Sequence, residues 1–124
     1  MEQLADYLDE VDHPAIKGMY DTFHANIEEK NPIGAIKTIR KHMVHVHISE
    51  NDRGTPGKGH IAWEATYKAL RKSKYDGWLT IEAFGKSLPA LAAATRVWRQ
   101  FYPSTEEVYR FGYRHMRQGW DKAK

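Results

Sequence analysis

Three ionisable residues of different types stand near the carboxyl ends of three expected strands: Asp21, His47 and Glu82. The carboxyl ends of strands in parallel α/β folds converge on one site, so we expect these side chains to meet there. An imidazole with two carboxylates is a mixed nitrogen and oxygen ligand set, which suits manganese, magnesium, cobalt or zinc. The pattern therefore predicts a divalent-metal site. The hard oxygen ligands favour manganese or magnesium.

Each of these residues also has a purely structural interpretation. Asp21 can cap the helix that follows it, and His47 can be a hydrogen-bonded core histidine. Glu82 can form an ion pair with Lys86. Spacing alone leaves both interpretations open for each residue.

Three further residues are candidates for the same site. His45 shares the strand face of His47, but we expect His47 to be the ligand because it lies nearer the strand end. Arg53 lies in the glycine-rich loop that follows, where a guanidinium can bind hydroxyls or a phosphate of a small ligand, or can simply be solvated. His24, beside Asp21, has the same two interpretations.

The elements that must position these residues alternate between strand and helix patterns. Strand patterns cover residues 16–24, 43–49 and 77–84. In the second of them, Val44, Val46 and Ile48 are expected on one face, and His45, His47 and Ser49 on the other. Helical patterns cover the N-terminus up to His13–Pro14 and residues 25–41 (interrupted at Asn31–Pro32), 62–73, 88–102 and 104–120. At the interruption we expect Asn31 to cap the main helical stretch and Pro32 to be its first residue, and we expect Ser104 to cap the C-terminal helix.

This alternation predicts an α/β fold with about three parallel strands, helices on the outside and a C-terminal helix. A complete (β/α)8 barrel needs about 200 residues or more, and the chain has 124. We therefore expect residues 1–124 to form a single partial TIM-barrel domain.

Composition excludes several other functions. The chain has no cysteine, which rules out disulfides, thiolate metal sites and thiol nucleophiles. Its 19 basic and 16 acidic residues give a small, dispersed net charge of +3, which does not indicate a nucleic-acid partner. No apolar stretch approaches a membrane span and the N-terminus lacks a signal-peptide pattern, so a cytoplasmic protein without a membrane partner is expected.

Four segments carry a family resemblance: residues 21–29 (DTFHANIEE), 45–53 (HVHISENDR), 57–63 (GKGHIAW) and 75–84 (YDGWLTIEAF). In order and spacing they resemble the sugar phosphate isomerase/epimerase family of xylose isomerase-like TIM barrels, in its ketose 3-epimerase branch (D-tagatose and D-psicose 3-epimerases). The resemblance spans about residues 16–101. It corresponds to the last three strands of that family's barrel, and the first five strands have no counterpart.

The resemblance implies roles for individual residues. Asp21, His47 and Glu82 would bind a divalent metal, usually Mn²⁺, with Mg²⁺, Co²⁺ or Zn²⁺ as alternatives, while His24 and Arg53 would contact the oxygens of the sugar. Glu82 would also be one of two glutamates that move a proton through an enediolate. The second glutamate belongs to an earlier strand. Glu82 is followed by Ala83 where the nearest epimerases have proline, which leaves the particular sugar open.

The resemblance implies a metal-dependent isomerase or epimerase of a ketose or sugar phosphate, represented by its C-terminal, metal-binding portion. The alternative is a non-catalytic half-barrel that binds a ligand or assembles with a partner. A third possibility, an apurinic-site endonuclease of related architecture, is disfavoured because its three-zinc cluster needs more ligands than the sequence offers. Open strand edges predict a homo-oligomer or association with a missing N-terminal half-barrel.

Overall fold

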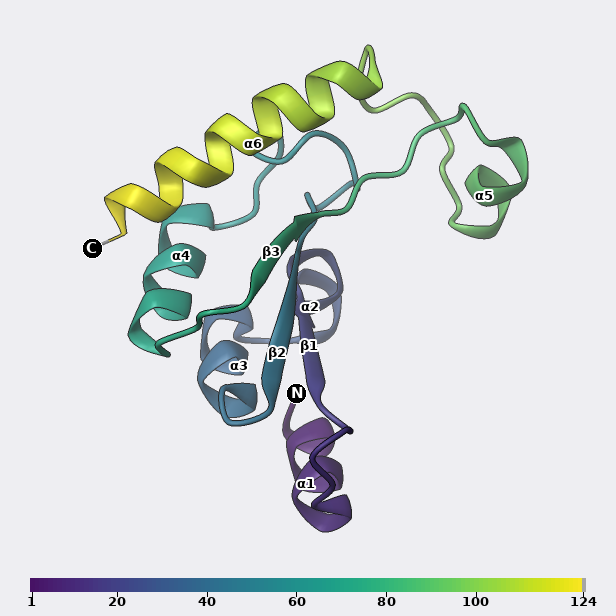
Figure 1. The fold of residues 1–124 in the computed structure, drawn as a ribbon. Helices are drawn as coiled ribbons and strands as arrows, with labels where there is room; N and C mark the ends of the chain where they lie inside the picture. Colours follow the sequence, from purple (N-terminus) through teal and green to yellow (C-terminus); the bar gives the residue numbers. More distant parts are fainter. Residues whose placement is uncertain (124) are drawn as a thin grey trace.

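The computed structural model describes residues 1–123. Its three strands form one parallel sheet in the order β1-β2-β3 (Figure 1), which confirms the predicted partial barrel. The strands are β1 (Gly18–Asp21), β2 (Met43–Ile48) and β3 (Trp78–Ile81). The helices are α1 (Glu2–Val11), α2 (Thr22–Glu28), α3 (Pro32–Ile39), α4 (Trp63–Lys72), α5 (Pro89–Ala94) and α6 (Thr105–Lys122).

The core lies between the sheet and the helices on one of its faces. Val46 and Ile48 of β2 are fully buried, as are Ile36 of α3 and Leu70 of α4, and all four belong to one apolar cluster. Figure 1 shows α3 and α4 side by side along this face, with α6 crossing beyond α4. Burying such aliphatic side chains contributes roughly 1.5–3 kcal/mol each, so this layer holds the strands in register.

Val44 departs from the predicted strand alternation. The pairing of β1 with β2 shifts between Gly18 and Met19, whose partners are Met43 and His45, so Val44 is an extra residue in the ladder. A bulge of this kind bends the strand and turns one side chain to the other face. Val44 is consequently 54% exposed instead of sharing the buried face of Val46 and Ile48.

Caps determine several helix boundaries. The strand predicted over residues 16–24 ends at Asp21, because the Asp21 carboxylate accepts hydrogen bonds from the first turn of α2. Asn31 caps α3 and Pro32 is its first residue, as predicted. Ser104 caps α6 by accepting from the backbone N–H of Glu107, which confirms the predicted start of the C-terminal helix.

The prediction of a single helix over residues 88–102 is wrong, because α5 ends at Ala94. Arg96 adopts a left-handed φ of 58°, and the N–H of Val97 donates back to the carbonyl of Ala92. This is a Schellman cap, in which the apolar residues at the two ends of the closing hydrogen bond, Ala92 and Val97, are both buried. The segment projects away from the body of the protein (Figure 1), so Trp98 has no core to enter and is 79% exposed.

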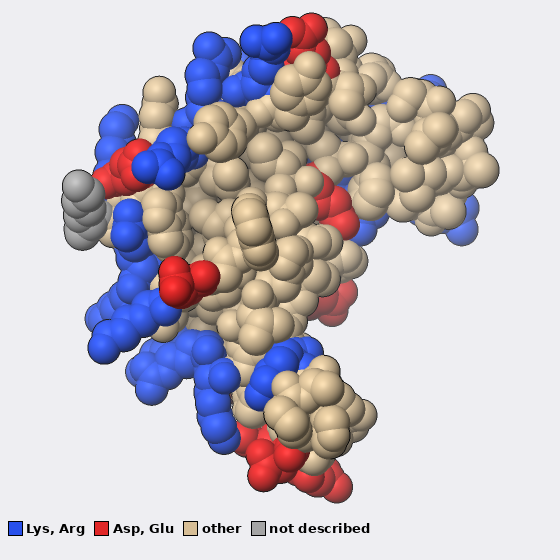
Figure 2. All heavy atoms as spheres, in the orientation of Figure 1, with Lys and Arg blue, Asp and Glu red and all other residues tan. Residues whose placement is uncertain are grey.

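Charged side chains are unevenly spread over the surface. In Figure 2, acidic side chains gather at the bottom over α1, while lysines and arginines follow the outer helices along the left edge. Residues 1–12 contain five acidic residues and no basic one. Within residues 1–123, no helix has both the length and the apolar character that a membrane span requires.

Candidate metal centre

Asp21 serves two purposes with its two carboxylate oxygens. Oδ1 accepts hydrogen bonds from the backbone N–H groups of Phe23 at 2.8 Å and His24 at 3.1 Å, which caps α2. Oδ2 lies 3.2 Å from Nδ1 of His47 at the end of the neighbouring strand. The capping interpretation is therefore correct for one oxygen, while the other faces the site.

His47 lies between the two carboxylates. Its Nδ1 is 3.2 Å from Asp21 Oδ2 and 3.2 Å from Glu82 Oε1. The sheet register explains the meeting: Asp21 pairs with His47, and His47 pairs with Thr80, two residues before Glu82 on the same face. The backbone N–H of Glu82 donates to the carbonyl of Ile48 at 3.1 Å, which extends the ladder to the site. Glu82 thus pairs with His47 and not with Lys86.

The three side chains fit a divalent cation. One ligand atom from each residue lies within 4.8 Å of the other two, little more than twice a metal–ligand distance of about 2.1 Å. Glu82 Oε2 is buried and has no hydrogen-bond partner among the described residues. A buried carboxylate oxygen without a partner is costly, and a cation coordinated at this point would remove that cost.

Arg53 and His24 lie together beside this centre. The Arg53 Nη2 is 3.3 Å from His24 Nε2, and the guanidinium carbon lies 4.0 Å from the ring centre of Phe23 and 4.8 Å from that of Phe84. Phe23 and Phe84 each follow a carboxylate of the centre by two residues. The guanidinium is therefore held at the rim of the metal centre by cation–π contacts.

His45 is a neighbour of the centre and stands outside the cluster. Its ring is 5.1 Å from the ring of His47 in an edge-to-face arrangement, and its register partner is Trp78. His45 therefore lies one layer further from the strand ends than His47, which agrees with the predicted order of the two histidines.

Glu50 is a residue whose importance the sequence analysis missed. Its side chain is fully buried, and its carboxylate accepts four hydrogen bonds, from the backbone N–H groups of Asn51, Gly57 and Ile61 and from the indole N–H of Trp63. The sequence feature that could have identified Glu50 is its position just before a glycine-rich loop. The turns of such a loop leave many backbone N–H groups in need of an acceptor.

Glu50 makes stability depend on pH. Burial raises the pKa of its carboxyl, but the four hydrogen bonds to the charged form outweigh burial and hold the pKa below its ordinary value of 4.5. The resulting stabilisation is present above pH 4.5 and is lost as pH falls through the lower folded-state pKa. We expect the melting temperature to fall on acidification below about pH 4.5, and to fall less steeply in Glu50→Gln. Equal slopes in both proteins would contradict this assignment.

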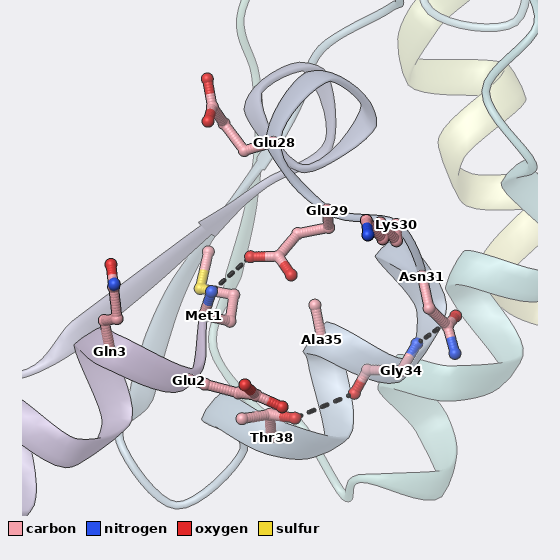
Figure 3. A pocket seen from close by; sticks show the side chains of 10 residues that line it. All are labelled: Met1, Glu2, Gln3, Glu28, Glu29, Lys30, Asn31, Gly34, Ala35 and Thr38. Carbon is pink, nitrogen blue, oxygen red and sulfur yellow. Dashed lines mark hydrogen bonds and ion pairs between the residues drawn. The ribbon is translucent and has the colours of Figure 1, made fainter.

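A surface pocket of about 630 Å³ lies away from the centre, among α1, α2 and α3 (Figure 3). In it, Glu29 pairs with the amino group of Met1, and Asn31 binds the N–H of Gly34. None of the three metal-site residues lines it. The site of interest is therefore the cluster at the strand ends.

Comparisons with known proteins place this chain in a family. The model of the xylose isomerase-like TIM barrel matches residues 1–118. A probable ketose 3-epimerase of Synechocystis sp. (strain ATCC 27184 / PCC 6803 / Kazusa) is 42% identical over 111 residues, 90% of this chain and 39% of the relative. A D-psicose 3-epimerase of Enterocloster bolteae is 36% identical over 106 residues, 86% of this chain and 35% of the relative.

A solved structure has a similar fold. The D-psicose 3-epimerase of Clostridium cellulolyticum H10, determined with D-tagatose, superposes with a TM-score of 0.85 at 31% identity and covers 94% of this chain and 42% of that one. The chain thus spans about two-fifths of the length of the relatives it matches. The predicted resemblance is confirmed: the chain belongs to the xylose isomerase-like TIM barrel family, and its similar relatives are ketose 3-epimerases.

Proposed function

We propose that this chain supplies the metal-binding and proton-transferring part of a sugar isomerase or epimerase that acts on a ketose or a ketose phosphate. The observation that carries the proposal is the meeting of Asp21, His47 and Glu82 at the carboxyl ends of three parallel strands. The ketose 3-epimerases among its relatives support the substrate class.

The residues that would hold the metal are Asp21, His47 and Glu82. Asp21 Oδ2, His47 Nδ1 and a carboxylate oxygen of Glu82 are the atoms that face one another and would be the ligands. The two carboxylates make Mn²⁺ our first choice, with Mg²⁺, Co²⁺ and Zn²⁺ as alternatives. When bound, such a cation polarises the carbonyl of the sugar and stabilises negative charge on its oxygen.

Glu82 would be the catalytic residue. Its carboxylate would accept the proton from the carbon next to the ketose carbonyl, leaving an enediolate, and would then return the proton. Arg53 and His24 would hydrogen-bond the hydroxyls or phosphate of the sugar, since both present nitrogen atoms at the rim of the centre. Inverting a carbon also requires an acid/base group on the opposite face of the sugar, which these three strands do not provide.

Proton exchange tests this proposal with the chain as it is, because exchange needs a base on one face only. We expect the Mn²⁺-loaded chain to incorporate deuterium at C3 of D-fructose in D₂O, as followed by NMR. At saturating Mn²⁺, Glu82→Gln should slow the exchange by about 100-fold or more. Glu64→Gln, an exposed glutamate on α4, is the matched control and should leave the rate unchanged.

The outcomes separate the two candidate functions. Exchange that depends on Glu82 supports the isomerase or epimerase. A chain that binds Mn²⁺ and shows no exchange above the metal alone would contradict catalysis by these strands, leaving the non-catalytic half-barrel.

We also propose that the sheet face bearing His47 is covered by a second copy of the chain when the 124-residue protein is alone in solution. Three apolar side chains line this face and remain exposed, Met19, Val44 and Trp78, the last at 80%. β1 and β3 each leave one edge unpaired within residues 1–123, and open edges and apolar patches favour association.

Sedimentation velocity checks this association. We expect the wild-type chain to sediment as a dimer and Trp78→Lys to sediment as a monomer. Trp98→Lys changes an equally exposed tryptophan on the projecting segment, away from the sheet face, and should leave the dimer intact. A monomeric wild type would refute self-association and would leave further barrel strands as the cover for this face.

A further inference from the structure

The loop between β2 and α4 is tied to one buried side chain. Glu50 Oε1 accepts from the N–H groups of Asn51 at 3.1 Å and Ile61 at 3.0 Å. Its Oε2 accepts from the N–H of Gly57 at 2.8 Å and from the indole of Trp63 at 2.9 Å. One carboxylate therefore joins the start, the middle and the end of the loop to the first residue of α4.

Arg53 is the residue that this loop presents to the metal centre. It has a left-handed φ of 61°, which is uncommon for a residue with a side chain. Its backbone N–H donates to the Glu50 carbonyl at 2.9 Å, and its carbonyl accepts from the N–H of Phe84 at 2.9 Å. The backbone of Arg53 is thus fixed between the end of β2 and the segment that leaves β3.

The Arg53 side chain has few polar contacts of its own. Its Nε is buried without a hydrogen-bond partner among the described residues, and its polar contact is the one to exposed His24. The faces of Phe23 and Phe84 hold the guanidinium, and such contacts depend on where the backbone places the arginine. The position of the guanidinium therefore follows from the conformation of the loop.

We propose that Glu50 is a positioning residue, whose buried carboxylate holds the loop in the conformation that places the Arg53 guanidinium between Phe23 and Phe84 at the rim of the metal centre. Glu50 does not touch the centre itself, which stands on the strand ends. That Arg53 contacts the sugar rests on the proposed function, whereas its placement by Glu50 does not.

NMR of the arginine side chain tests the placement without any ligand. In the wild type, two aromatic rings face the guanidinium, so we expect the Arg53 Nε–H signal to be shifted upfield and protected from exchange with water. In Glu50→Gln, which keeps the shape but replaces one acceptor oxygen by a donor, this signal should lose its shift and protection. The ring signals of His47 should stay in place, because the strands remain paired.

Two further variants keep the test decisive. Glu50→Asp keeps the charge but is one methylene shorter and cannot reach all four donors, so it should displace the Arg53 signal partly; it decides the question where Glu50→Gln fails to fold. Glu64→Gln is the exposed control and should leave the signal unchanged. Folded Glu50→Gln or Glu50→Asp protein in which the Arg53 signal stays shifted upfield and protected, as in the wild type, would overturn the proposal.

Titration with D-fructose separates this proposal from the proposed function. In the Mn²⁺-saturated chain, Glu50→Gln and Arg53→Ala should each weaken D-fructose binding, and the double variant should lose no more than Arg53→Ala alone. Mn²⁺ affinity should be the same in all of them. Losses that add would overturn the claim that Glu50 acts through Arg53. A wild type that binds no D-fructose would contradict the proposed function while leaving the NMR result to decide the role of Glu50.

Discussion

Replacing His47 with alanine is expected to weaken Mn²⁺ binding by about 100-fold or more, equivalent to about 2.7 kcal/mol. His47 Nδ1 is the atom that lies 3.2 Å from both carboxylates of the cluster. Its removal takes away the nitrogen ligand and leaves the two carboxylates as the remaining ligands. Calorimetric titration with Mn²⁺ measures the loss directly.

His45→Ala is the matched control for this experiment. His45 lies on the same strand and the same face, with its ring 5.1 Å from that of His47, but outside the cluster. Its replacement should change the affinity less than about threefold, equivalent to under 1 kcal/mol. Unchanged binding in His47→Ala would remove His47 from the site, whereas equal losses in both variants would indicate general damage to β2.

Replacing Glu50 with leucine is expected to lower the free energy of unfolding by about 3 kcal/mol or more. The leucine fills a similar volume but accepts no hydrogen bond, so the N–H groups that the carboxylate binds lose their partner inside the protein. Each buried donor left without a partner costs roughly 1–3 kcal/mol. Urea denaturation followed by circular dichroism gives the difference.

Glu64→Leu provides the comparison for this loss. Glu64 follows Trp63 in the first turn of α4, but its side chain is 82% exposed and its partner is Lys68 one turn later. Such a surface pair contributes about 0.5 kcal/mol or less. A loss of stability in Glu50→Leu no larger than that in Glu64→Leu would show that the buried carboxylate does not hold the loop.

The sequence was sufficient for the features that local chemistry decides. Asn31, Pro32 and Ser104 were correctly predicted as helix starts because capping is a contact between residues two or three apart. The convergence of Asp21, His47 and Glu82 was also predictable, since parallel strands bring their carboxyl ends to one edge.

Features that depend on distant packing were not predictable in this way. The bulge at Val44 arises from the pairing of β2 with β1, which no pattern within β2 reveals. Residues 95–102 have a helical pattern, but they project beyond the body and leave Trp98 exposed. The role of Glu50 depends on a loop that folds back, so that the backbone N–H of Ile61, eleven residues further along the chain, reaches the Glu50 carboxylate.

The most direct test of the metal centre is the melting temperature of the wild type and of His47→Ala, each with and without Mn²⁺. A ligand that binds the native state alone stabilises it by about 2.7 kcal/mol at 100 times its dissociation constant, which corresponds to a rise of roughly 10 °C for a domain of this size. We predict this rise in the wild type and its loss in His47→Ala. No rise in the wild type, or an equal rise in both proteins, would contradict a metal centre at Asp21, His47 and Glu82.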